Sequence, residues 1–252
     1  MIRGQIINVP SDGALSFHVL DTDSNTWNEG DGNIGPWRLH KFLYLDGKPL
    51  YLIGNECGTC RALFRKLDNA KLPLPPSSLI ESFENGLDRI SQNTIDGIKI
   101  ILPKGKYVVG IFDIFPTLVE SSRSGSNFYE AEYYWLNIIR RERRELHQEV
   151  ILPIVLKQKL NKERITHYQN KIHGGIKPTA LALSFIDVRM VRGEWHEWTL
   201  AHCLLDGHHK LMAASSIGQS ISILSFIKTD EVPDFLSDDE WLKQHYHIDE
   251  SR

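Results

Sequence analysis

The segment 204–218 constrains the fold of this chain more than any other segment. It reads LLDGHHK and continues as LMAASSIG. Apolar residues that end in an Asp-Gly pair predict a strand that stops at a tight turn, and the Ala-rich run after it predicts a helix. The first N–H groups of a helix have no intrahelical partners and therefore attract anions. The sequence thus predicts an anion site at this turn, with a phosphate as its natural occupant.

The residues of the turn itself would strengthen such a site. We expect the phosphate to be bound by the glycine and the three basic residues after it, Gly207, His208, His209 and Lys210. Asp206 precedes them and is the candidate ligand of Mg²⁺. A replacement of Lys210 by Ala is expected to remove a charge without disturbing a core. The alternative interpretation is a plain strand–helix junction whose histidines cap the helix or face solvent.

The elements around the motif have a recognisable order. D-G-H-H-K before an Ala-rich helix resembles the helix-opening signature of the ParB/sulfiredoxin-like superfamily, which often reads D-G-H-H-R or D-G-H-K-R. The resemblance covers roughly the last 100 residues of the chain. It rests on a predicted strand, helix, Gly-Gly corner, two strands, the motif and a last strand, which occupy residues 150–155, 161–173, 174–175, 177–186, 198–205, 204–218 and 221–226.

The resemblance implies a nucleotide-binding protein, with ATP or another nucleotide and Mg²⁺ as cofactors. The motif of this chain is similar to that of members that act as small-molecule kinases. In those kinases an acidic residue of the first helix serves as base or metal partner. Carried to this chain, the catalytic residues would be Asp206 and Glu163, although Glu163 also fits an ordinary helix start. The reactive cysteine of the sulfiredoxins is replaced by His208, which argues against sulfiredoxin chemistry. The Gly-Glu-Arg-Arg motif and helix-turn-helix domain of the DNA-binding ParB proteins are not found.

Composition bounds the remaining possibilities. The chain has 252 residues, of which 41% are hydrophobic and 24% charged, as in ordinary globular proteins. Its formal charge of −3 gives no general attraction to nucleic acid or to an anionic membrane. No apolar run approaches the roughly 20 residues of a membrane span, and the first residues lack a signal peptide. We therefore expect a cytoplasmic protein whose partner is a nucleotide or a phosphorylated small molecule.

The overall pattern predicts an α+β protein of two parts. Hairpins at 41–53 and 98–112 and a helix within 79–90 suggest an N-terminal mixed domain. The predicted division is a mixed domain that contains a C-x-x-C, a connecting helix, the ParB/sulfiredoxin-like domain and an acidic tail with one short helix, at residues 1–128, 129–149, 150–228 and 229–252.

The C-x-x-C at Cys57 and Cys60 has three interpretations. It could be half of a zinc site, because two thiolates at this spacing suit tetrahedral Zn²⁺. It could be a redox pair at a helix start, or two small residues in a turn with no ligand. Cys203, the third cysteine, is expected to lie in the core because it shares a strand face with Leu205.

Three functions remain open at this point. The first is a phosphate- or nucleotide-binding enzyme, with phosphoryl transfer to a small molecule as its reaction. The second is a module that senses a nucleotide at the same site without turnover. The third is an interaction protein stabilised by zinc at Cys57 and Cys60.

Overall fold

The computed structural model describes residues 5–21, 39–54, 63–66, 75–119, 133–142, 145–155, 157–191 and 195–230. Helices and two sheets make up this part of the chain, so the predicted α+β class is confirmed. The helices are α1 (Ser77–Asn85), α2 (Gln92–Lys99), α3 (Lys162–His173) and α4 (His208–Ile217). The strands are β1 (Gln5–Val9), β2 (Leu15–Asp21), β3 (Leu39–Leu45), β4 (Lys48–Gly54), β5 (Leu63–Lys66), β6 (Gly105–Ile114), β7 (Thr117–Val119), β8 (Tyr133–Glu142), β9 (Glu145–Pro153), β10 (Thr179–Val191), β11 (Trp195–Asp206) and β12 (Ile221–Lys228).

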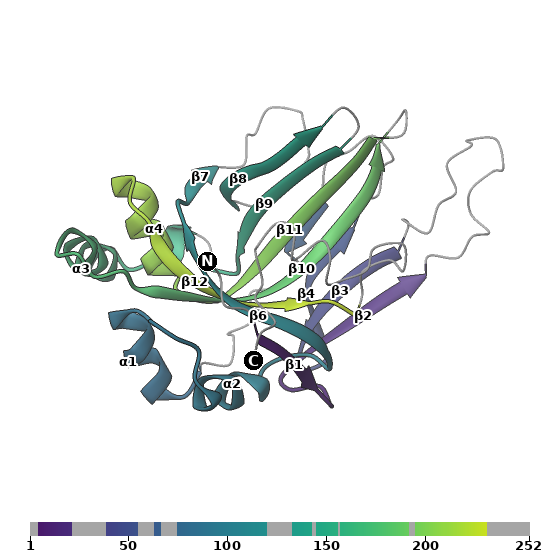
Figure 1. Ribbon diagram of the computed structural model, residues 1–252, viewed down its shortest axis with the longest axis horizontal. Coiled ribbons are helices and arrows are strands. Elements are labelled where there is room, and N and C mark those ends of the chain that lie inside the picture. Colours follow the sequence, from purple (N-terminus) through teal and green to yellow (C-terminus); the bar gives the residue numbers. More distant parts are fainter. Residues whose placement is uncertain are drawn as a thin grey trace.

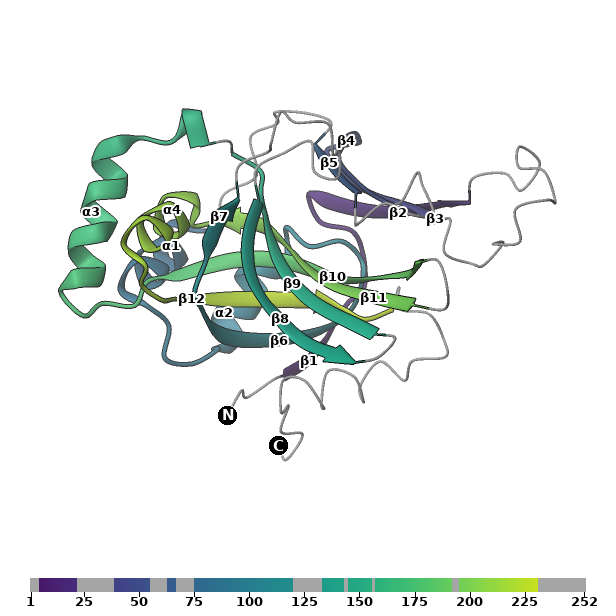
Figure 2. The same cartoon turned by 90° about the horizontal axis from the view of Figure 1, so that it is seen from above.

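The large sheet is mixed and runs in the order β1-β6-β12-β10-β11-β9-β8-β7. Its parallel pairs are β10 with β12 and β11 with β9, and its other pairs are antiparallel. The small sheet, β2-β3-β4-β5, is antiparallel throughout. Figure 1 and Figure 2 both place α3 and α4 side by side at one end of the molecule. Figure 2 shows the small sheet as a separate layer against one face of the large sheet.

Both faces of the central strand β12 and of the first half of β10 are buried, and alternation along the strands divides the core into two halves. On β10, Leu181, Leu183 and Phe185 face the side that carries the small sheet, α1 and α2. The residues between them, Ala180 and Ala182, face the side that packs against α3 and α4. Successive side chains of a strand point to opposite faces, so a strand covered on both sides buries every side chain and is mostly apolar. β12 is buried from end to end, and its polar residues Ser222, Ser225 and Lys228 have hydrogen-bond partners within the protein.

The predicted order of elements from residue 150 onward is confirmed: β9, α3, β10, β11, α4 and β12 follow one another. Asn161 caps α3, because its Oδ1 accepts a hydrogen bond from the backbone N–H of Arg164 at 3.1 Å. The hairpin predicted at 41–53 is confirmed as β3 and β4. Its turn residues Asp46 and Gly47 both have positive φ, as a two-residue hairpin turn requires.

The connecting helix predicted at 129–149 is wrong, because this stretch contributes β8 and β9. The segment holds aromatic and β-branched residues that favour strands, and its pairing with β11 outweighs the helix-forming Arg and Glu residues. The second predicted hairpin is also wrong in its first half, where α2 stands. Strands β1, β6 and β7 join the sheet of the C-terminal region, so the large sheet crosses the predicted boundary between the parts.

The predictions around the C-x-x-C and the tail have different outcomes. The C-x-x-C was expected to start a helix, but residues 63–66, shortly after it, form strand β5. Cys57 and Cys60 themselves lie outside the described residues, as does the predicted helix of the acidic tail. Cys203 is fully buried in the core, as predicted.

A substitution at Gly207 tests the turn before α4. Gly207 has φ 102°, and a Cβ on it would lie 2.8 Å from the Cβ of Ala180. We expect Gly207→Ala to lower the free energy of unfolding by about 2–4 kcal/mol, because a left-handed residue costs roughly 1–2 kcal/mol and the overlap adds to it. Gly175→Ala is the control, since Gly175 has φ 86° but open space around its Cβ position. Equal losses in urea denaturation of the two variants would contradict the role of the close contact.

Candidate functional site

The predicted strand–turn–helix junction is present. β11 ends at Asp206, Gly207 adopts a left-handed conformation, and α4 begins at His208. No side chain caps this helix, and its first turn contains no acidic residue. The positive end of the helix dipole is therefore not compensated from within α4.

The two histidines of the motif act as hydrogen-bond acceptors. His208 Nε2 accepts the backbone N–H of Ile154 at 3.1 Å, and His209 Nε2 accepts that of Asn161 at 3.1 Å. A ring nitrogen that accepts carries no proton, so both bonds require neutral imidazoles with the proton on Nδ1. The histidines therefore hold the segment between β9 and α3 against α4, whereas the sequence suggested that they donate to an anion.

Lys210 is buried, which corrects the expectation that it lies outside the core. Its side chain is only 2% exposed, and its Nζ donates to Asp206 Oδ2 at 3.0 Å and to the Thr179 carbonyl at 2.9 Å. The ammonium also lies within 6 Å of two aromatic ring centroids, those of Phe83 and Tyr168. Burial lowers the pKa of Lys210, and the neighbouring Asp206 carboxylate opposes that shift.

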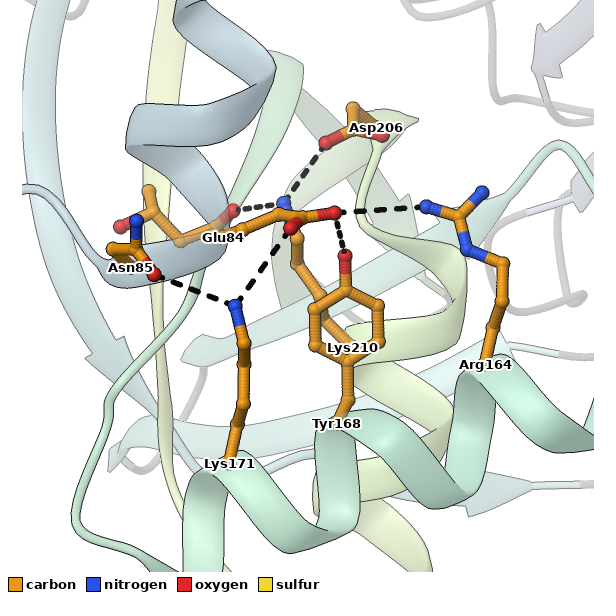
Figure 3. Close-up of polar contacts among 8 residues, drawn as sticks. Glu84, Asn85, Arg164, Tyr168, Lys171, Asp206 and Lys210 are labelled. Carbon is orange, nitrogen blue, oxygen red and sulfur yellow. Dashed lines mark hydrogen bonds and ion pairs between the residues drawn. The ribbon is translucent and has the colours of Figure 1, made fainter.

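A second carboxylate, that of Glu84 at the end of α1, is contacted by three side chains of α3 (Figure 3). Its Oε1 accepts a hydrogen bond from the Tyr168 hydroxyl at 2.9 Å. Arg164 Nη2 lies 3.7 Å from Oε1, and Lys171 Nζ lies 3.7 Å from Oε2. We call the connected set the Glu84 cluster; it consists of Glu84, Arg164, Tyr168, Lys171, Asp206 and Lys210.

The Glu84 cluster carries more positive than negative charge. Three cations face two carboxylates, and the uncapped start of α4 adds the positive end of its dipole. Burial acts to raise the pKa of Glu84, but the Tyr168 hydrogen bond and the surrounding cations outweigh it, so the pKa lies below its ordinary value. Burial and the bond to Glu84 raise the pKa of Tyr168. The cluster thus stabilises the ionised form of the Glu84 carboxylate.

The structure joins only some of the predicted site residues. Asp206, Gly207 and Lys210 meet at the start of α4, whereas the histidine rings contact the neighbouring segment. Glu163 is exposed in the first turn of α3, where a carboxylate complements the helix dipole. Within the described part of the chain, no hydrogen bond or ion pair joins Glu163 to Asp206 or Lys210.

The described residues contain no group of three or more His, Cys, Asp or Glu side chains that could hold a metal ion. A magnesium ion at Asp206 would therefore take most of its oxygen ligands from bound phosphates and water, which is common for this ion. No helix in the described part of the chain is long and apolar enough to cross a membrane.

Sequence reasoning missed four members of the cluster. Arg164, Tyr168 and Lys171 are spaced i, i+4 and i+7, and so share one face of α3. That spacing could have indicated them, because it sets two cations and a tyrosine on one face of a helix that belongs to the same predicted domain as the motif. Glu84 has no such signal, since only the packing of α1 against the rest of the fold brings it there.

Comparison with known proteins adds no relative. No family model matches the chain. Neither a curated protein nor a solved structure matches it.

The Lys210–Asp206 pair can be tested through stability. We expect Lys210→Met to lower the free energy of unfolding by about 2–3 kcal/mol, because Asp206 and the Thr179 carbonyl lose their buried donor. Lys177→Met is the control: Lys177 pairs with Asp113 at 2.8 Å, but both side chains are largely exposed. That change should cost less than about 1 kcal/mol. Equal effects in denaturant titrations would show that burial does not strengthen the Lys210 pair.

The neutral state of His209 predicts a pH dependence. Burial and the Arg164 charge lower the pKa of His209 below its ordinary value of 6.5, although Asp206 opposes them. The unfolded chain therefore binds a proton first as the pH falls, and the stability that neutral His209 contributes above pH 6.5 is lost below it. We expect His209→Gln to flatten the fall in unfolding free energy between about pH 7.5 and pH 5.5. An unchanged profile in His209→Gln would contradict the assignment.

Proposed function

We propose that this protein binds a phosphate-bearing ligand, a nucleotide or a phosphorylated small molecule, at the start of α4. The observation that carries the proposal is the excess of positive charge in the Glu84 cluster beside an uncapped helix N-terminus. Helix N-termini with nearby cations are common phosphate sites, because free N–H groups and the helix dipole act together. The resemblance of D-G-H-H-K to the ParB/sulfiredoxin-like superfamily supports the same ligand class.

The proposed roles follow from exposure and charge. Arg164 is 56% exposed and is the cation that a ligand in solution meets first. Lys171 and Lys210 lie deeper and would supply fixed positive charge. Asp206, which is 23% exposed, would share its carboxylate between Lys210 and a magnesium ion that arrives with the phosphates. With Mg²⁺ in place, aligned phosphates and neutralised charge are what phosphoryl transfer needs from a protein.

A ligand screen tests the proposal. Thermal unfolding is followed with inorganic phosphate, ADP, ATP and CTP, each with and without Mg²⁺. A specific ligand at 100 times its Kd should stabilise the fold by about 2.7 kcal/mol. No stabilisation by any phosphate-bearing compound at millimolar concentration would refute the proposal. Nucleotide turnover that is lost in Asp206→Asn would identify an enzyme, and binding without turnover a sensor.

Arg164 gives a sharper test by substitution. We expect Arg164→Gln to weaken binding of the compound found in the screen by about three- to tenfold, the effect of one lost charge-assisted hydrogen bond at an exposed site. Folding should be little affected, since the backbone N–H of Arg164 keeps its bond to Asn161. Lys162→Gln removes the same charge from an exposed residue of the same helix and should bind like wild type in calorimetric titrations. Equal weakening by both variants would point to general electrostatics instead of a defined contact.

A further inference from the structure

The carboxylate of Glu84 is held as a bound anion would be. One hydroxyl, one guanidinium and one ammonium approach it, all from α3, and the Lys210 ammonium of α4 adds its charge. None of these four groups belongs to α1, the helix that carries Glu84. In Figure 3 the side chains of α3 reach across the gap between the helices towards this one carboxylate. These donors are arranged as they would be around a bound oxyanion, and the Glu84 carboxylate occupies that position.

The place of Glu84 on its own helix is unfavourable. It stands in the last turn of α1, where the negative end of the helix dipole repels a carboxylate, and that turn holds no basic residue. The compensation comes from α3 and α4 alone. Glu84 therefore contributes little to α1 itself, and its effect is to neutralise the neighbouring cations.

We propose that Glu84 is an internal competitor for the phosphate: its carboxylate occupies the donors of Arg164, Tyr168 and Lys171 until a ligand displaces it. This inference rests on the proposed function and concerns the regulation of the same site. Without Glu84, the three cations of the cluster exceed the single charge of Asp206 by two, which matches the charge of a phosphate dianion. A phosphate also offers more acceptor oxygens than a carboxylate.

Displacement requires little movement of the fold. The Glu84 side chain is 28% exposed, so it can turn towards solvent without crossing the core. α1 stays anchored by Leu79 and Phe83, which are buried. A second contact, from Lys171 Nζ to Asn85 Oδ1 at 3.3 Å, still joins α1 to α3 when the carboxylate leaves. The exchange therefore needs only a change in the Glu84 side-chain conformation. The apparent affinity for phosphate then depends on how much more strongly the donors bind phosphate than the Glu84 carboxylate.

The experiment measures the Kd of inorganic phosphate by calorimetric titration for wild type, Glu84→Gln and Glu84→Asp. Glutamine keeps an acceptor for Tyr168 but carries no charge, and aspartate keeps the charge on a shorter side chain. We expect Glu84→Gln to bind phosphate about three- to tenfold tighter than wild type, and Glu84→Asp to fall between them. Glu81→Gln removes the same charge from an exposed residue of α1 and should leave the Kd unchanged.

The outcomes distinguish a failure of the competitor role of Glu84 from a failure of the proposed phosphate binding. Phosphate binding of equal or lower affinity in folded Glu84→Gln overturns the competitor role and leaves the phosphate site standing. If Glu84→Gln does not fold, a Kd in Glu84→Asp no lower than that of wild type overturns it in the same way. Binding by Glu84→Gln alone supports both proposals. An absence of phosphate binding in all the variants and in wild type overturns both.

Discussion

The ion pair between Lys210 and Asp206 is the interaction on which this end of the molecule depends. It closes the turn at Gly207 by linking the last residue of β11 to the first turn of α4, and a second hydrogen bond of the Lys210 ammonium reaches the start of β10 at the Thr179 carbonyl. A cation in such a place must be paired, because an isolated buried charge is far too costly. The left-handed Gly207 brings the backbone close enough to Ala180 for this pair to form. This ion pair is also the buried part of the Glu84 cluster.

The elements with strong local signals were predictable. The Asp46–Gly47 hairpin, the Asn161 cap of α3 and the Gly207 turn each depend on a residue type that a specific backbone geometry requires. Strand β8 and the first half of β9 were not, because helix-forming charged residues there are outweighed by sheet pairing: β9 pairs with β11, a strand distant in the sequence, and β8 pairs with β9. The sequence also could not show that Lys210 is buried. A lysine directly after two histidines looks exposed until Asp206 and two aromatic rings are known to surround it.

The candidate site combines two uses of positive charge. The start of α4 supplies the positive end of its helix dipole, and α3 and α4 supply the cationic side chains of Arg164, Lys171 and Lys210. Such a concentration of like charge would repel itself without internal carboxylates, and Asp206 and Glu84 supply them. The two carboxylates differ in their partners: Asp206 is paired with the buried Lys210 ammonium, whereas the partners of Glu84 include the exposed Arg164 guanidinium as well as the buried Tyr168 hydroxyl. In the proposed exchange, Glu84 is the carboxylate that an incoming anion would replace.

The order of strands in the large sheet has a consequence for how the chain reaches its fold. β6 pairs with β12 from Ile114 opposite Ile221 to Tyr107 opposite Lys228, so neighbours in the middle of the sheet are far apart in the chain. Contacts of this kind form late, because a long loop must close before they return any stability. During synthesis on the ribosome, β1 and β6 both emerge before β12, so the edge of β6 that pairs with β12 has to wait for that strand. Until then an apolar strand edge stays unpaired, and unpaired strand edges favour aggregation with other chains.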